Sequence, residues 1–236
     1  MFKYWRACNL DFFSTVPTRV LTLPLFGTLL SLLGLPLCFY LGYRYRNSRR
    51  FIIVVRSVLA LMMLLVYLWY VRIGFPLHEA LPLYHCRIGM FTILLLPNRN
   101  IFKHYFALLG VVGAVLAVAV PAFYPYPLVH VTNTFFFVGH YSLLILSLAY
   151  LFEKAEHELS WRQIISITLG LNLALVIVNY HTLANYGFLA DTPLIHTTNI
   201  PFNYVLVSAV MILLVKLVSV MLQFFSAKNN YFMKTF

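Results

Sequence analysis

Residues 108–120 read LLGVVGAVLAVAV, an apolar run without a polar side chain. With its apolar neighbours the run is long enough to cross a bilayer, since the hydrocarbon core requires about 20 mostly apolar residues in a helix. Gly110 and Gly113 are three residues apart, and small residues at such spacing let membrane helices approach closely. The stretch therefore predicts a membrane helix that packs tightly against its neighbours.

The whole chain has the same apolar character. Of its 236 residues, 62% are hydrophobic and 10% are charged, whereas soluble domains carry about 25% charged residues. The net charge of +11 comes from Lys and Arg between hydrophobic runs, a pattern that sets membrane topology, so we expect no nucleic-acid partner. The three cysteines lack paired spacing, and we expect no metal, cofactor or disulfide framework.

Hydrophobic runs predict an all-α bundle of about seven transmembrane helices in one membrane-embedded domain over residues 1–236. The expected spans are 21–43, 51–71, 81–97, 102–123, 131–152, 162–180 and 202–225. Eleven Lys and Arg flank one side of these spans and four flank the other. This places the N-terminus outside and the C-terminus in the cytoplasm. Residues 1–20 are expected to form an interfacial leader, and 181–201 an outer loop.

Residues 81–89, LPLYHCRIG, place Tyr, His, Cys and Arg in succession where the third run begins. Pro82 suits the first turn of a helix, which puts Cys86 near the positive end of the helix dipole and beside Arg87. Both features stabilise a thiolate, so Cys86 is a candidate nucleophile. The alternative is a small buried hydrophobic residue with no chemical role.

A thiol nucleophile needs a base, and His140 lies deep in the fifth predicted span. Asn172 lies at nearly the same depth in the sixth, with Asn179 on the same face, so a Cys–His–Asn arrangement follows. In the long outer loop, His181 is a second candidate base and Asp191 the only carboxylate. The alternative is that these polar groups only join helices by hydrogen bonds.

Two stretches also resemble a known family. LPLYHC resembles the Leu-Pro-Leu-x-x-Cys helix start of the YwaF-like bacterial integral membrane proteins, and FFFVGHYSLLILSLAYL (135–151) resembles their histidine-containing helix. That family is similar to a eukaryotic transmembrane cysteine acyltransferase of ether phospholipids and, distantly, to intramembrane threonine hydrolases of fatty-acid esters. A histidine often precedes the family's cysteine by two residues, whereas Tyr84 stands there in this chain and His85 is adjacent.

The resemblance implies that Cys86 accepts an acyl group and that His140 is its base. The expected protein is a lipid acyltransferase or acyl-ester hydrolase of the bacterial plasma membrane, with its site near the outer leaflet and a phospholipid or other acyl lipid as partner. N–H groups at 84–86, with Arg87, would stabilise the oxyanion. The alternatives are a non-enzymatic transporter or lipid-binding component, and a structural membrane protein; acyl donor, acceptor and oligomeric state are not defined by the sequence.

Overall fold

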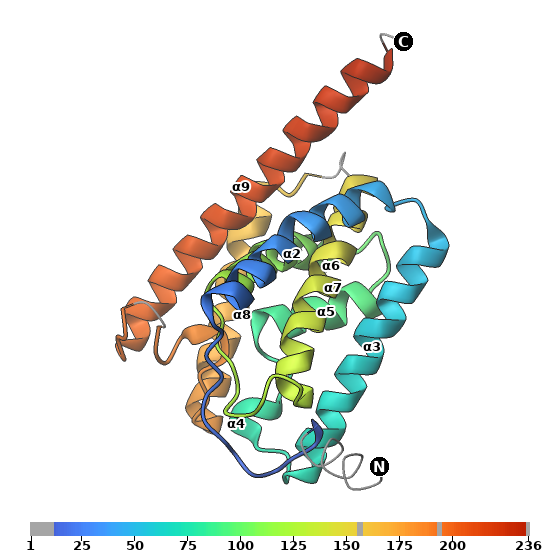
Figure 1. The fold of residues 1–236 in the computed structure, drawn as a ribbon. Coiled ribbons are helices and arrows are strands. Elements are labelled where there is room, and N and C mark those ends of the chain that lie inside the picture. The colour runs from blue at the N-terminus through green and yellow to red at the C-terminus, as the bar shows by residue number, and fades with distance from the viewer. Residues whose placement is uncertain (1–11, 155–157, 193–194, 235–236) are drawn as a thin grey trace, which may run out of the picture.

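A computed structural model describes residues 12–154, 158–192 and 195–234, with side chains through residue 225 (Figure 1). The described residues form helices joined by loops and turns, with no strand among them. The elements are α2 (Leu25–Arg44), α3 (Arg49–Arg72), α4 (Leu77–Ala80), α5 (His85–Leu95), α6 (Ile101–Ala119), α7 (Val131–Glu153), α8 (Trp161–Thr182), the 3₁₀ turn η1 (Tyr186–Phe188) and α9 (Ile200–Lys234). The all-helical prediction is confirmed for this part of the chain.

Six described helices, α2, α3, α6, α7, α8 and α9, are long and apolar enough to cross a membrane. The predicted third span, 81–97, is helical only over the 11 residues of α5. At 1.5 Å per residue α5 extends for about 16 Å, roughly half of a 30 Å hydrocarbon core. Seven membrane-spanning helices are therefore not confirmed.

Pro82 explains why α5 starts late. Leu81, the residue before it, has φ −63° and ψ 145°, the extended conformation that a following proline favours. Tyr84 is also extended and forms the N-cap of α5. Pro82 thus lies in the turn before the helix and not in its first turn, which corrects the sequence-based expectation.

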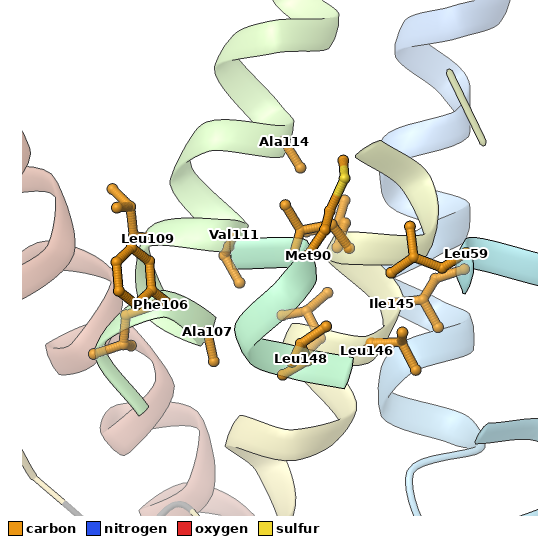
Figure 2. Packing of buried hydrophobic residues seen from close by; sticks show 14 of the residues in the cluster. Leu59, Met90, Phe106, Ala107, Leu109, Val111, Ala114, Ile145, Leu146 and Leu148 are labelled. Atoms are coloured by element: carbon orange, nitrogen blue, oxygen red, sulfur yellow. The ribbon is translucent and has the colours of Figure 1, made fainter. Parts of the chain in front are cut away.

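The centre of the bundle is formed by α6 and α7, with two thirds of the most apolar window of each buried. Figure 2 shows how buried side chains cluster around Met90 of α5. Gly110 lies so close to α7 that a Cβ there would stand 2.7 Å from the Ser147 Oγ. The close packing predicted from LLGVVGAVLAVAV is therefore confirmed.

The beginning of α7 is held by loops. Asn133 accepts a hydrogen bond from the Tyr124 N–H (3.0 Å), and the Ser14 carbonyl accepts from both Trp69 (2.9 Å) and His130 (3.0 Å). Residues 12–20 of the predicted leader thus include a contact with the bundle, while 1–11 lie outside the described residues. The other end of α7 meets the loop after α5, where Tyr150 donates to the Asn98 carbonyl (2.9 Å).

Candidate functional site

The first turn of α5 begins inside the bundle. Its residues contact the middle parts of two other helices. Cys86 faces Gly113, which lies six residues before the end of α6, and His85 faces Asn172, which lies ten residues before the end of α8. No side chain caps the start of α5. Because first-turn N–H groups have no intrahelical acceptor, this helix start presents donors and the positive end of its dipole to the interior.

Cys86 is half-buried and packs against the main hydrophobic cluster. Its Sγ lies 2.7 Å from the position that a Cβ on Gly113 would take. Any side chain at residue 113 would therefore displace the thiol. The pair of Gly110 and Gly113 thus serves two purposes: Gly110 admits α7, and Gly113 makes room for the sulfur.

His140 is also half-buried and lies on α7. Its Nδ1 is 2.6 Å from the Phe136 carbonyl oxygen. Because a carbonyl can only accept, Nδ1 carries the proton of the neutral ring and Nε2 keeps its lone pair. The Nε2 atom is therefore in the form that a general base requires.

The helices that carry Cys86 and His140, α5 and α7, are in contact. Met90 follows Cys86 by one helical turn on the same face of α5, and its Cε lies 3.0 Å from where a Cβ on Gly139 would stand. The charge of Arg87 also acts on His140. The structure contains no hydrogen bond between Cys86 and His140 themselves, both of which are described.

Asn172 orients His85 and not His140, contrary to the sequence-based expectation. The His85 Nε2 and the Asn172 Oδ1 are 2.9 Å apart, and the Asn172 amide nitrogen donates to the Ser208 Oγ (2.9 Å). The same amide nitrogen lies 3.7 Å from the Met211 Sδ, which can only accept, so Oδ1 is the atom that faces His85, and it accepts from Nε2–H and leaves the His85 Nδ1 with its lone pair. In the neutral form of both rings, the described site therefore holds two histidines that each have one unprotonated nitrogen.

Part of the predicted outer loop covers His85. A Cβ on Gly187 would stand 2.8 Å from the His85 Cε1, and Gly187 has φ +70°, a conformation suited to glycine. Asn179 holds the loop in place by bonding both the N–H (2.8 Å) and the carbonyl (2.9 Å) of Tyr186. Asn179 thus supports the loop without reaching the thiol.

Arg87 points away from the thiol, toward α3. Its guanidinium donates to the Glu79 carbonyl (2.7 Å), the Tyr70 hydroxyl (2.6 Å) and the Tyr124 hydroxyl (3.0 Å). Burial raises the pKa of the Tyr124 hydroxyl well above its usual range, so this partner stays protonated. Arg87 joins the beginning of α5 to α3 and to the loop before α7, and this geometry does not support the expected role at an oxyanion.

The remaining predicted residues lie at the surface. His181 is exposed and stacks edge-on with the Tyr180 ring, 5.4 Å between centroids. Asp191 is exposed, and its Oδ2 is 3.8 Å from the His196 Nδ1. Neither reaches the start of α5. In the described residues no group of three or more His, Cys, Asp or Glu is arranged to hold a metal ion.

Sequence reasoning missed Ser208 and Gly187. Ser208 is an isolated serine in an apolar helix and gives no signal of its own. Gly187, in the stretch NYG, has the residue type that favours a positive φ, so a special turn was detectable there. Its position over His85 was not, because the two residues are about a hundred positions apart.

The model of one protein family matches residues 12–223, which include every candidate residue discussed above. The chain belongs to the TMEM164 family. With six apolar helices and this membership, the TMEM164-family chain is a multi-pass membrane protein. No curated protein and no solved structure matches it.

Proposed function

We propose that this TMEM164-family protein transfers or hydrolyses lipid acyl groups, with Cys86 as the nucleophile and His140 as the base. One observation carries the proposal. The half-buried Cys86 thiol lies in the uncapped first turn of α5, which begins inside the bundle, and the neighbouring helix α7 carries His140, whose Nε2 is unprotonated in the neutral ring. The resemblance of the two sequence stretches to the YwaF-like proteins supports the same assignment.

In the first step, the His140 Nε2 takes the thiol proton as the Cys86 sulfur bonds to the carbonyl carbon of an acyl ester. The negative oxygen of the tetrahedral intermediate lies at the free N–H groups of the α5 first turn. The intermediate then releases the alcohol, which receives the proton from His140, and a thioester remains on Cys86. In the second step, water or a lipid hydroxyl or amine attacks the thioester carbonyl carbon and loses its proton to His140. The bond between that carbon and the Cys86 sulfur then breaks, the acid, ester or amide product leaves, and His140 returns the proton to the sulfur to restore the thiol.

His85 is also a candidate base, because the chain Ser208–Asn172–His85 resembles the way an amide orients a catalytic histidine. Its neighbour Cys86 faces α6, whereas the His85 ring faces α8. Consecutive helical residues point about 100° apart. We therefore assign His85 to substrate positioning beneath Gly187, and removal of each histidine in turn tests this division of roles.

The contacts at the two ends of α5 support a proposal for how this part of the chain crosses the membrane. Arg87 bonds the Glu79 carbonyl and Tyr124, which is attached to Asn133 at the beginning of α7, while Asn98 meets Tyr150 near the end of α7. We propose that α4 and α5 together make a third crossing as a broken helix, which is tolerated where protein covers the irregular backbone. The N-terminus then lies outside and the C-terminus in the cytoplasm of a bacterial plasma membrane.

The deciding experiment measures the intact mass of the purified protein by mass spectrometry after exposure to a long-chain p-nitrophenyl ester. We expect one acyl adduct that maps to Cys86, is absent in Cys86→Ala, and forms at least about 10²-fold more slowly in His140→Ala, because general-base catalysis contributes at least that factor. His85→Ala should weaken ester binding more than it slows the step at saturating ester. Cys38, a buried free thiol on α2, is the internal control.

If Cys86 acquires the acyl group no faster than Cys38, the catalytic proposal is rejected. Reconstitution into proteoliposomes then separates the alternatives. Substrate-dependent flux would identify a transporter, whereas retention of lipid without flux would identify a lipid-binding component. If His85→Ala abolishes the adduct and His140→Ala does not, the two histidines exchange roles.

A further inference from the structure

A second polar cluster lies at the end of the bundle where α5 ends and α6 begins. Lys103 of α6 is only 2% exposed, although a lysine near a membrane helix end normally extends its ammonium group to water. Its Nζ donates to the Leu96 carbonyl (2.7 Å) and lies 5.6 Å from the centre of the Tyr150 ring. This ammonium group is therefore held inside the protein.

A second cation approaches from α3. Arg56 lies near enough to Lys103 for the two charges to interact. The side chain is half-buried, and its Nε is fully buried without a hydrogen-bond acceptor. Among residues 12–154, 158–192 and 195–225, no carboxylate lies within ion-pair distance of either side chain. Glu153 acts on Lys103 from farther away, but it is about half exposed and pairs with Lys154 (3.3 Å).

Two neighbouring cations without a close carboxylate are costly in a low-dielectric interior, because they repel each other and have lost part of their hydration. An anion with several oxygens would lower both costs, since its oxygens are acceptors for the Arg56 Nε–H and its negative charge attracts the Lys103 ammonium. Arginine and lysine together are typical of phosphate binding, and basic sites between membrane helices bind lipid headgroups.

We propose that Arg56 and Lys103 bind a phosphate-bearing anion, either the phosphodiester of an anionic lipid headgroup or free phosphate. The site is separate from the start of α5. Lys103 and Gly113 are ten residues apart on α6, about 15 Å along the helix. The proposal therefore does not depend on Cys86 chemistry. His104, also buried and with its ring centre 5.9 Å from that of Tyr150, is the nearest further titratable group on α6.

The test measures the melting temperature of the full-length detergent-solubilised protein by tryptophan fluorescence. Phosphatidylglycerol, phosphatidylcholine at equal mole fraction and inorganic phosphate are titrated separately. We expect phosphatidylglycerol, and not phosphatidylcholine, to raise the melting temperature. Arg56→Gln and Lys103→Gln should each weaken the apparent affinity at least about tenfold, the effect of losing one hydrogen bond to a charged group. If inorganic phosphate raises the melting temperature to a similar extent, free phosphate is a sufficient ligand. If phosphatidylglycerol raises the melting temperature and inorganic phosphate does not, the ligand is the lipid headgroup.

Arg50→Gln is the matched control, because Arg50 is an exposed cation on the same helix. Equal losses in Arg50→Gln and Arg56→Gln would overturn the proposal and indicate general surface attraction, as would the absence of any anion-dependent shift. Arg56→Lys keeps the charge without the Nε donor and tests the site if Arg56→Gln does not fold; it should bind with intermediate affinity, and binding equal to wild type would overturn the role of Nε.

Residues 155–157, which include Glu156, lie outside the described part of the chain. Glu156→Gln is therefore included. Its response to phosphatidylglycerol should equal that of the wild type. A response that appears only in Glu156→Gln would show that this carboxylate already neutralises the two cations, and the proposal would be rejected.

Discussion

Replacement of Gly113 by alanine tests the geometry around the thiol directly. The new Cβ would stand 2.7 Å from the Cys86 Sγ, well inside the contact distance of carbon and sulfur, so either the sulfur must rotate or α5 and α6 must separate. Overpacking of this kind costs about 1–3 kcal/mol. Replacing a helical glycine by alanine gains about 1 kcal/mol, so we expect a net loss of about 0–2 kcal/mol.

Gly170→Ala is the control, because a Cβ at Gly170 of α8 meets nothing within 4 Å. This variant should keep the helix gain without the overlap and be stabilised by up to about 1 kcal/mol. The two variants should therefore differ by about 1–3 kcal/mol. At about 2–4 °C per kcal/mol for a chain of this size, their melting temperatures should differ by several degrees.

The double variant Cys86→Ala/Gly113→Ala decides the cause. Removing the sulfur removes the overlap, so Gly113→Ala should no longer destabilise the protein in the Cys86→Ala background, and the coupling in the double-mutant cycle should be about 1–3 kcal/mol. Thermal unfolding supplies the stability differences, and the rate of acyl-adduct formation supplies the effect on the thiol. If Gly113→Ala and Gly170→Ala have equal melting temperatures and the cycle shows no coupling, Cys86 does not face α6 as described.

Three further predictions concern the polar contacts. Asn172→Ala should lower stability by about 1–3 kcal/mol in thermal unfolding, because the half-buried His85 Nε2–H loses its acceptor; an unchanged melting temperature would argue against this bond. Asn179→Ala should free Tyr186 from two backbone bonds and speed limited proteolysis within 183–192 while distant cleavage stays constant. Burial lowers the pKa of His130 below its ordinary value of 6.5, so the unfolded state binds the proton first and stability should fall as pH drops below about 6.5. His130→Asn keeps a helix-capping residue type and should have a flatter melting-temperature profile between pH 8 and pH 5; equal slopes would refute the assignment.

Hydropathy alone determined that the chain is a helical membrane protein. An apolar run such as 108–120 can satisfy its backbone in lipid only as a helix, and its glycines predicted that this helix packs closely against its neighbours. The pattern also placed Cys86, His140 and Asn172 within predicted spans, at similar depths in the membrane. It could not predict the length of α5, because an apolar run has the same composition whether or not all of it is helical, and the extended Leu81 and Tyr84 before that helix interrupt the run.

Tertiary structure decided which polar groups meet. The sequence gives the depth of a residue along its helix but not the rotation of that helix about its axis. Residues at similar depth, such as His85 and His140, are therefore equivalent partners for Asn172 until the packing is known. The packing of α8 and α9 turns Asn172 toward Ser208 and His85, while the close approach of α5 to α6 turns Cys86 toward Gly113. These pairings depend on contacts between distant segments, and local pattern contains no information about them.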